Sequence, residues 1–350
     1  MNIERINSLL RQVISKFDIS LDRYCVLTEA ASGYFIITPL LAAMGGSRRV
    51  LAMARDSRYG RAEEIARDTL DLAKRWGVVD RIEILFSRDD ERIGEADIVT
   101  NLGFVRPIDA NLIEKFKRIV SISLMWETWE FRPQDLDLGL CRSLGIPVLG
   151  TNEHHPDLKI FSYIGHVVLK LLYELEIEIF KSMVVIVGNG EFAEEAQDTL
   201  FRAGATATLL NISELSTELG RKFIQQADAL VLLEHHDRQM LIGENGLISA
   251  KALHDLNPSL VIAHICGGAS QGDLENMKLR FLPRTIAPSG YMSVSTTYVG
   301  PKPIIELHAA GLRVGQAMAM AIEQGMSGVD AEKWALANCE YAQGFNDRHY

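Results

Sequence analysis

Short apolar runs alternate with longer segments of helical periodicity along most of the chain. The apolar runs are nearly continuous, which is typical of parallel strands covered by helices on both faces. The pattern therefore predicts an α/β protein. The expected strands are 24–30, 49–56, 81–87, 97–103, 119–126 and 146–151 in the first half, and 183–188, 205–211, 228–234, 260–265 and 284–289 in the second.

One apolar helix, residues 158–180, separates the two series of strands. Charged residues interrupt it too often for a bilayer span, which needs about 20 mostly apolar residues. Two strand series joined by this long helix predict two Rossmann-like, doubly wound parallel-sheet domains with a cleft between them. The C-terminal helices expected over 302–325 and 330–345 have no strands of their own, so the first should cross back onto the N-terminal domain. The expected domains are 1–155 plus 303–350 for substrate, and 156–302 for NAD(P).

Charge and cysteine usage exclude several classes of function. A formal charge of −10 disfavours nucleic acid, which requires a basic face. The four cysteines form no CxxC pair, which argues against a disulfide framework and against zinc, and fits a cytoplasmic protein. The adjacent histidine pairs also lack metal-binding spacing, so no metal is expected. The N-terminal segment is typical of an amphipathic helix and not of a signal peptide.

The stretch VVIVGNGEFAEEA contains a G-x-G-x-x-A motif between an expected strand and an expected helix. In such a turn, Gly188 permits the tight bend, Gly190 lets a pyrophosphate approach the backbone, and Ala193 lets helix and strand pack closely. Phe192 belongs to the same turn. The motif predicts a site for a nicotinamide dinucleotide.

Two residues leave open which dinucleotide binds, and whether binding is retained. Asn211 stands where an acid would hold the ribose hydroxyls of NAD, so both NAD and NADP remain possible. Glu191 lies in the first helical turn, where free N–H groups attract anions, and its carboxylate could take the place of a phosphate. Alternatively, Glu191 points to solvent.

From about residue 145 to 321 the chain resembles the D-2-hydroxyacid dehydrogenase family. The similar segments are GIPVLGTNEHH, the linking helix, the glycine turn, ADALVLLEHH and LISAKALHDLNPSLVIAHICGG. The resemblance covers about half the chain and implies two domains, a nicotinamide cofactor, hydride transfer in the cleft and a dimer. It also implies an Arg at the position of Cys266, whose guanidinium would bind the substrate carboxylate through two hydrogen bonds. A thiol cannot replace that guanidinium. The stretch TEAASGYFIITPLLAAMGGSRRVLAMARDS is weakly similar to S-adenosylhomocysteine hydrolase-type domains.

Several polar residues follow expected strands of the first half, where ligands bind in open parallel sheets. Glu29 is a possible proton acceptor. Arg55 and Arg106 could hold an anionic substrate group, since an Arg fork matches a carboxylate or phosphate. The alternatives are a surface ion-pair cluster around Arg55 and a plain turn at Arg106.

Further candidates combine carboxylates, aromatic rings and histidines. Trp126 and Trp129 flank Glu127, and aromatic walls raise the pKa of a Glu toward neutrality; alternatively, both tryptophans pack an interdomain surface. Histidines that could carry the proton accompanying hydride transfer are His154, His155 and His235, and further residues that could reach substrate are Asn152 and Tyr291.

Together these features predict an NAD(P)-dependent oxidoreductase that moves hydride to or from a small polar, anionic substrate in the interdomain cleft. The alternative is a non-catalytic dinucleotide-binding or sensor protein on the same fold. No nucleic-acid or membrane partner is expected. Because the helix 158–180 is apolar nearly all round, a homodimer buried through it is expected. The residues expected to contact the cofactor are Gly188, Gly190, Glu191, Phe192, Ala193, Asn211, His235 and Cys266.

Overall fold

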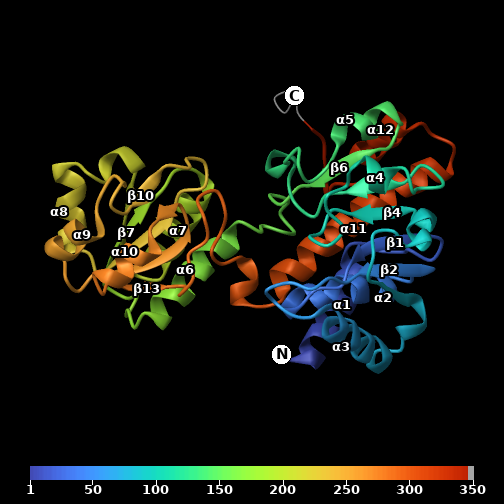
Figure 1. The fold of residues 1–350 in the computed structure, drawn as a ribbon. Coiled ribbons are helices and arrows are strands. Elements are labelled where there is room, and N and C mark those ends of the chain that lie inside the picture. Colours follow the sequence, from blue (N-terminus) through green and yellow to red (C-terminus); the bar gives the residue numbers. More distant parts are fainter. Residues whose placement is uncertain (346–350) are drawn as a thin grey trace. The chain divides into compact units, whose positions relative to one another are not determined.

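A computed structural model describes residues 1–345, which form two compact units. Unit 1 comprises Met1–Leu158 and the chain from Pro301 onward, and unit 2 comprises Lys159–Gly300 (Figure 1). Each unit contains a sheet built mainly of parallel strands with helices packed against it. The predicted α/β class with two Rossmann-like units is therefore confirmed.

The sheet of unit 1 has the order β14-β6-β5-β4-β1-β2-β3, in which only β14 runs antiparallel to its neighbour. The six parallel strands thus follow the 3-2-1-4-5-6 order of dinucleotide-binding domains, and the direction of winding reverses between β1 and β4. Ligands of such sheets bind beyond the carboxyl ends of the strands at this reversal. The strands are β1 (Cys25–Glu29), β2 (Arg49–Met53), β3 (Ile82–Leu85), β4 (Ile98–Thr100), β5 (Ser121–Ser123), β6 (Val148–Thr151) and β14 (Ala342–Gln343).

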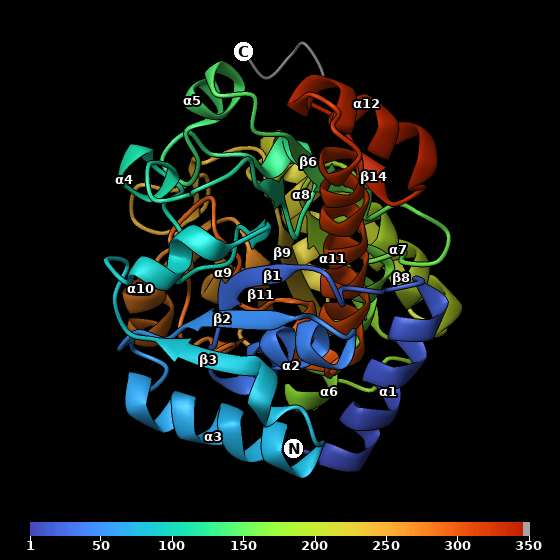
Figure 2. The same cartoon turned by 90° about the vertical axis from the view of Figure 1, so that its right-hand side faces the viewer.

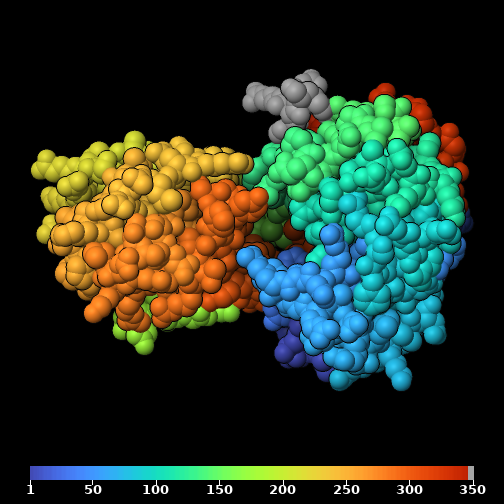
Figure 3. Space-filling view, viewed as in Figure 1, coloured from blue at the N-terminus to red at the C-terminus, as the bar shows by residue number. Residues whose placement is uncertain are grey.

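The helix α11 (Lys302–Glu323) lies along one face of this sheet and contacts β4, β5 and β6 (Figure 2). Two glycines allow the close approach: a Cβ at Gly311 would lie 2.4 Å from the sulfur of Met125, and one at Gly315 would lie 2.7 Å from a methyl of Ile98. In the space-filling view the segments from β1 to β6 lie in front of α11 (Figure 3). The other helices of unit 1 are α1 (Ile3–Lys16), α2 (Ile37–Met44), α3 (Ala62–Arg75), α4 (Ala110–Ile113), α5 (Leu138–Ser143) and α12 (Gly328–Asn338).

Unit 2 has a five-stranded parallel sheet in the order β13-β11-β9-β7-β8, so its winding reverses between β7 and β9. Side chains on one sheet face pack with α6 and α7, and those on the other face pack with α8, α9 and α10. Its strands are β7 (Met183–Val187), β8 (Thr206–Leu210), β9 (Ala229–Leu233), β11 (Val261–Cys266) and β13 (Arg280–Leu282), with a separate pair β10 (Met240–Ile242) and β12 (Gly268–Ala269). Its helices are α6 (Ser162–Glu174), α7 (Glu191–Arg202), α8 (Glu218–Gln226), α9 (Ala250–Leu256) and α10 (Gln271–Asn276).

Three elements differ from the pattern-based expectation. The helix expected over 158–180 is shorter, because Lys159 (φ 43°) and Glu176 (φ 66°) adopt left-handed backbone conformations just outside α6. The strand expected over 284–289 does not form, and β13 precedes it. The last helix ends at Asn338, after which Cys339 is extended and the chain adds β14 to the edge of β6.

The four cysteines are all buried and unpaired with one another. Within residues 1–345, every helix is too short or too polar to span a bilayer.

Candidate functional site

The glycine turn lies where the winding of unit 2 reverses, between the end of β7 and the start of α7. A Cβ at Gly188 would lie 2.5 Å from the carbonyl oxygen of Leu233, so this position must be glycine for β7 and β9 to pack. Gly190 has φ 77° and forms the N-cap of α7. Ala193 is buried between the helix and the sheet. The local geometry of the motif is therefore as the sequence predicted.

An unpredicted acid closes this turn from the end of β9. Glu234 is buried, and its carboxylate accepts backbone hydrogen bonds from Asn189 (3.2 Å), His236 (2.8 Å) and Asp237 (2.9 Å). One amide of the glycine turn therefore already has an anionic partner within the protein. The signal for this residue in the sequence is an acid placed directly after the apolar run ALVLL.

Two imidazole rings also lie against the turn. The ring of His235 stacks on Phe192 with 4.4 Å between centroids, and it contacts the ring of His236 at 3.8 Å. A Cβ at Gly190 would lie 3.3 Å from Nε2 of His236. Burial, and then the neighbouring His236, lower the pKa of His235, which keeps its ring neutral at physiological pH.

The loop after β8 supplies a carboxylate close to Asn211. Asn211 is exposed, and its backbone N–H donates to Oε2 of Glu214 at 2.9 Å. The sequence motif points to the residue at the strand end, so it gave no indication of this acid three residues later. Glu191 is the first residue of α7 and is half-buried, and Tyr291 lies in an exposed loop of the same unit.

Cys266 ends β11 and is buried. Burial, followed by the negative charge of Glu234, raises the pKa of its thiol to about 12. The thiol therefore stays neutral, and it supplies neither a nucleophile nor the cation that an Arg would present.

In unit 1, Glu29 and Arg106 lie together at the reversal between β1 and β4. Glu29 is buried, and its Oε2 accepts the N–H of Phe104 at 2.9 Å. Burial raises the pKa of Glu29, although this backbone hydrogen bond and the charge of Arg106 act in the opposite direction. Arg106 pairs with Asp135 at 2.8 Å. A carboxyl group with a raised pKa keeps its proton to a higher pH than an ordinary carboxyl group does.

A second acidic group lies beyond β5 and β6. Glu127 is buried; it accepts the indole N–H of Trp129 (2.8 Å) and the backbone N–H of Glu153 (3.0 Å), and it lies 3.4 Å from Nε2 of His154. Glu130 and Glu153 interact through their side chains. Burial, together with the charges of neighbouring carboxylates, raises the pKa of Glu130 to about 7 and that of Glu153 well above its usual value.

The remaining predicted residues of unit 1 make other contacts. His155 contacts the C-terminal segment, with Nε2 3.3 Å from Glu340 and its ring 4.6 Å from that of Tyr341. Asn152 accepts the N–H of His154 in a local turn. Arg55 is exposed after β2. Across residues 1–345, no group of three or more His, Cys, Asp or Glu side chains is arranged to hold a metal ion.

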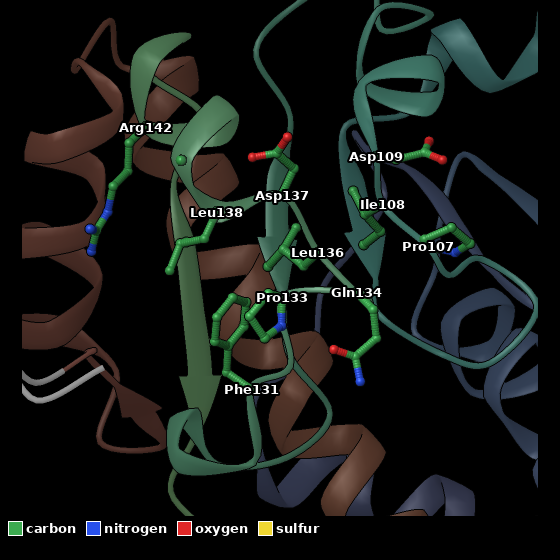
Figure 4. Close-up of a pocket in the computed structure, with 11 residues that line it drawn as sticks. Pro107, Ile108, Asp109, Phe131, Pro133, Gln134, Leu136, Asp137, Leu138 and Arg142 are labelled. Atoms are coloured by element: carbon green, nitrogen blue, oxygen red, sulfur yellow. The ribbon is translucent and has the colours of Figure 1, made fainter. Parts of the chain in front are cut away.

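A groove of about 510 Å³ opens in unit 1 between the segments 107–109 and 131–142 (Figure 4). Its two acids already serve as helix caps: Asp109 accepts the N–H of Leu112, and Asp137 accepts the N–H of Leu140. Asp109 also pairs with Arg88. Because both acids already stabilise the local structure, we place no functional site in this groove.

Comparison with solved structures identifies proteins of similar fold. A dipicolinate synthase chain from Bacillus subtilis is 11% identical, with 87% of this chain and 99% of that chain covered and a TM-score of 0.53. The corresponding dipicolinate synthase chain from Bacillus halodurans is 10% identical (83% and 96% covered, TM-score 0.50), and the pyruvate reductase of Chlamydomonas reinhardtii is 11% identical (86% and 97% covered, TM-score 0.46).

This chain is similar in fold to dipicolinate synthase. The α/β fold that the sequence predicted agrees with this similarity. No family model matches the sequence, and no curated protein matches it.

Proposed function

We propose that the protein is an NAD(P)-dependent oxidoreductase that transfers hydride to or from a small polar, anionic substrate. The observation that carries this proposal is the G-x-G-x-x-A turn at the β7/β9 reversal, immediately before α7. A reversal of winding next to a helix N-terminus is where α/β sheets bind nucleotide phosphates.

The residues of unit 2 are compatible with a dinucleotide, although Glu234 already occupies one amide of the turn. Gly188, Gly190 and the N-terminus of α7 would receive the pyrophosphate. Glu214 would accept hydrogen bonds from the adenosine ribose hydroxyls, and its charge would repel a 2′-phosphate, which favours NAD over NADP. When bound, the nicotinamide supplies or accepts the hydride at its C4.

Unit 1 contributes proton-transfer groups and a cation. Burial raises the pKa of Glu29, so its carboxyl group would exchange a proton with a substrate oxygen. Arg106 would hold the anionic group of the substrate. Glu127 and His154 form a second acid–base pair, with 3.4 Å between them.

A second candidate function is a dinucleotide-binding protein without redox activity. One observation favours it. Cys266 is a neutral thiol where the resembling family has the Arg that binds substrate. A chain that senses a dinucleotide needs the turn but needs no substrate cation.

Turnover distinguishes the two functions. The full chain would be mixed with NADH or NADPH and a panel of small 2-oxo acids, and in the reverse direction with oxidised cofactors and 2-hydroxy acids, while nicotinamide absorbance is followed. The oxidoreductase proposal predicts turnover that Glu29→Gln reduces at least about tenfold and that Glu64→Gln, at an exposed position of α3, leaves unchanged. Cofactor binding without turnover over the whole panel supports the second function. Absence of cofactor binding contradicts both.

A further inference from the structure

Several buried side-chain donors of unit 1 have no acceptor among the described residues, and three of them follow β4 or β5. These three are Nδ2 of Asn101, Nε of Arg106 and Nε1 of Trp126. Asn101 is only 1% exposed. A buried donor without a partner costs roughly 1–3 kcal/mol, so native proteins seldom retain several at one place without a use for them.

Two contacts link the segments that carry these donors. Oδ1 of Asn101 accepts the N–H of Met125 at 2.8 Å, which fixes the amide beside the start of the Trp126 segment. The guanidinium carbon of Arg106 lies 4.7 Å from the ring centre of Trp126. All three residues follow β4 or β5, at the carboxyl edge of the sheet where parallel sheets bind ligands.

Glu29 lies close to Arg106, which carries one of these donors. The position that a Cβ of Gly103 would occupy lies 3.3 Å from Oε2 of Glu29 and 3.8 Å from Nη2 of Arg106. Because burial raises the pKa of Glu29, its carboxyl group retains a proton over a wider pH range. The positive charge of Arg106 is balanced by Asp135, with which it forms a 2.8 Å ion pair.

We propose that Asn101, Arg106 and Trp126 form a binding site for the oxygen atoms of an anionic group on a small-molecule ligand. All three unsatisfied atoms are donors, so the complementary ligand must present acceptors, and a carboxylate or a phosphate does so. This inference rests on the proposed function, in which the substrate is anionic. It identifies the residues that would hold the anionic group of that substrate. They would take the place of the guanidinium that Cys266 cannot supply.

The asparagine allows a sharp test by substitution. Asn101→Asp retains the oxygen that accepts the N–H of Met125, and it replaces the orphaned N–H₂ group with a second oxygen. The fold-supporting hydrogen bond is therefore kept, while the donor becomes a negatively charged acceptor. Asn7→Asp, in the N-terminal helix α1, is the matched control.

The test uses the full chain with isotope-labelled tryptophan and no dinucleotide, titrated separately with glycolate and with inorganic phosphate. The chain has four tryptophans, and Trp126→Phe identifies the indole N–H signal of Trp126. We expect that signal to shift saturably with at least one of the two anions. Asn101→Asp should weaken the affinity at least about tenfold, and Asn7→Asp should not change it.

Each result of the titration decides the inference. A response to glycolate alone assigns a carboxylate site, one to phosphate alone assigns a phosphate site, and one to both supports the shared oxygen chemistry. If the Trp126 signal moves with neither anion, or moves equally in Asn101→Asp, the inference is overturned. The titration contains no cofactor, so it can succeed where dinucleotide binding, and with it the proposed function, fails.

Discussion

The carboxylate of Glu234 accepts a hydrogen bond from the backbone N–H of Asn189 at 3.2 Å, so an acid from the end of β9 closes the glycine turn at the end of β7. In a dinucleotide-binding turn, the backbone amides face the pyrophosphate. A ligand at this turn would therefore share it with a fixed negative charge. Glu234 supports the local fold through three backbone hydrogen bonds and at the same time opposes the binding of an anion.

Replacing Glu234 by Gln should separate these two effects. The amide has one acceptor oxygen instead of two, so a buried N–H loses its partner, and the free energy of unfolding should fall by about 1–3 kcal/mol. Removal of the charge should tighten NADH binding by about two- to tenfold. Urea unfolding and calorimetric titration measure the two quantities. Glu244→Gln, at an exposed position of unit 2, should change neither. Weaker binding in Glu234→Gln would show that its charge does not act on the ligand.

Glu214 should set the preference between the two cofactors. Glu214→Gln keeps an oxygen for the N–H of Asn211 and removes the negative charge that would repel a 2′-phosphate. We expect the affinity for NADPH relative to NADH to rise about tenfold. Competition between the two cofactors measures this ratio. Glu218→Gln, at the exposed start of α8, is the control, and an unchanged ratio in Glu214→Gln would place the ribose elsewhere.

The carboxyl cluster around Glu130 should make stability depend on pH. Burial raises the pKa of Glu130 from 4.5 to about 7, so between these values the folded chain binds a proton that the unfolded chain has released. Stability must then fall as pH rises through this range, by up to about 3 kcal/mol, and no further change from this group follows above it. Urea unfolding at about pH 5 and about pH 8 should show the fall in wild type. Glu130→Gln should reduce it, and Glu64→Gln should not.

The homodimer expected from the apolar linking helix remains a prediction. Much of that apolar character is used within unit 2, because Val167, Val168 and Leu171 pack into its core. Large exposed side chains remain nearby, including Tyr173 (61% exposed) and Phe201 (73% exposed). Light scattering should give twice the 39.0 kDa chain mass, and Tyr173→Glu should lower it. A wild-type mass of 39.0 kDa would exclude the dimer.

The sequence predicted the structural elements that are determined by residues close together in the chain. Apolar runs identified every strand of the two main sheets except β13 and β14. The glycine motif located the β7–α7 turn, because the backbone conformation of Gly190 and the close packing at Gly188 both require glycine. The strand β14 could not be predicted, since two residues acquire strand structure only through pairing with β6.

The partners of the site residues could not be read from the sequence, because they come from distant segments. The contact of Glu234 with Asn189 spans 45 residues, and that of Arg106 with Asp135 spans 29. Asn101 illustrates the same limit. It falls within the strand expected over 97–103, but its burial and its unsatisfied amide depend on the packing of β4 against β5.

Binding of NADH to the glycine turn tests the central claim most directly. Calorimetric titration would compare the wild-type chain with Gly190→Ala, which places a Cβ 3.3 Å from His236 at φ 77°, and with Gly272→Ala, where a Cβ would meet nothing within 4 Å. We predict saturable binding to the wild type and to Gly272→Ala, and at least about tenfold weaker binding to Gly190→Ala. No binding to the wild type, or equal binding to all three, would contradict a dinucleotide site at this turn.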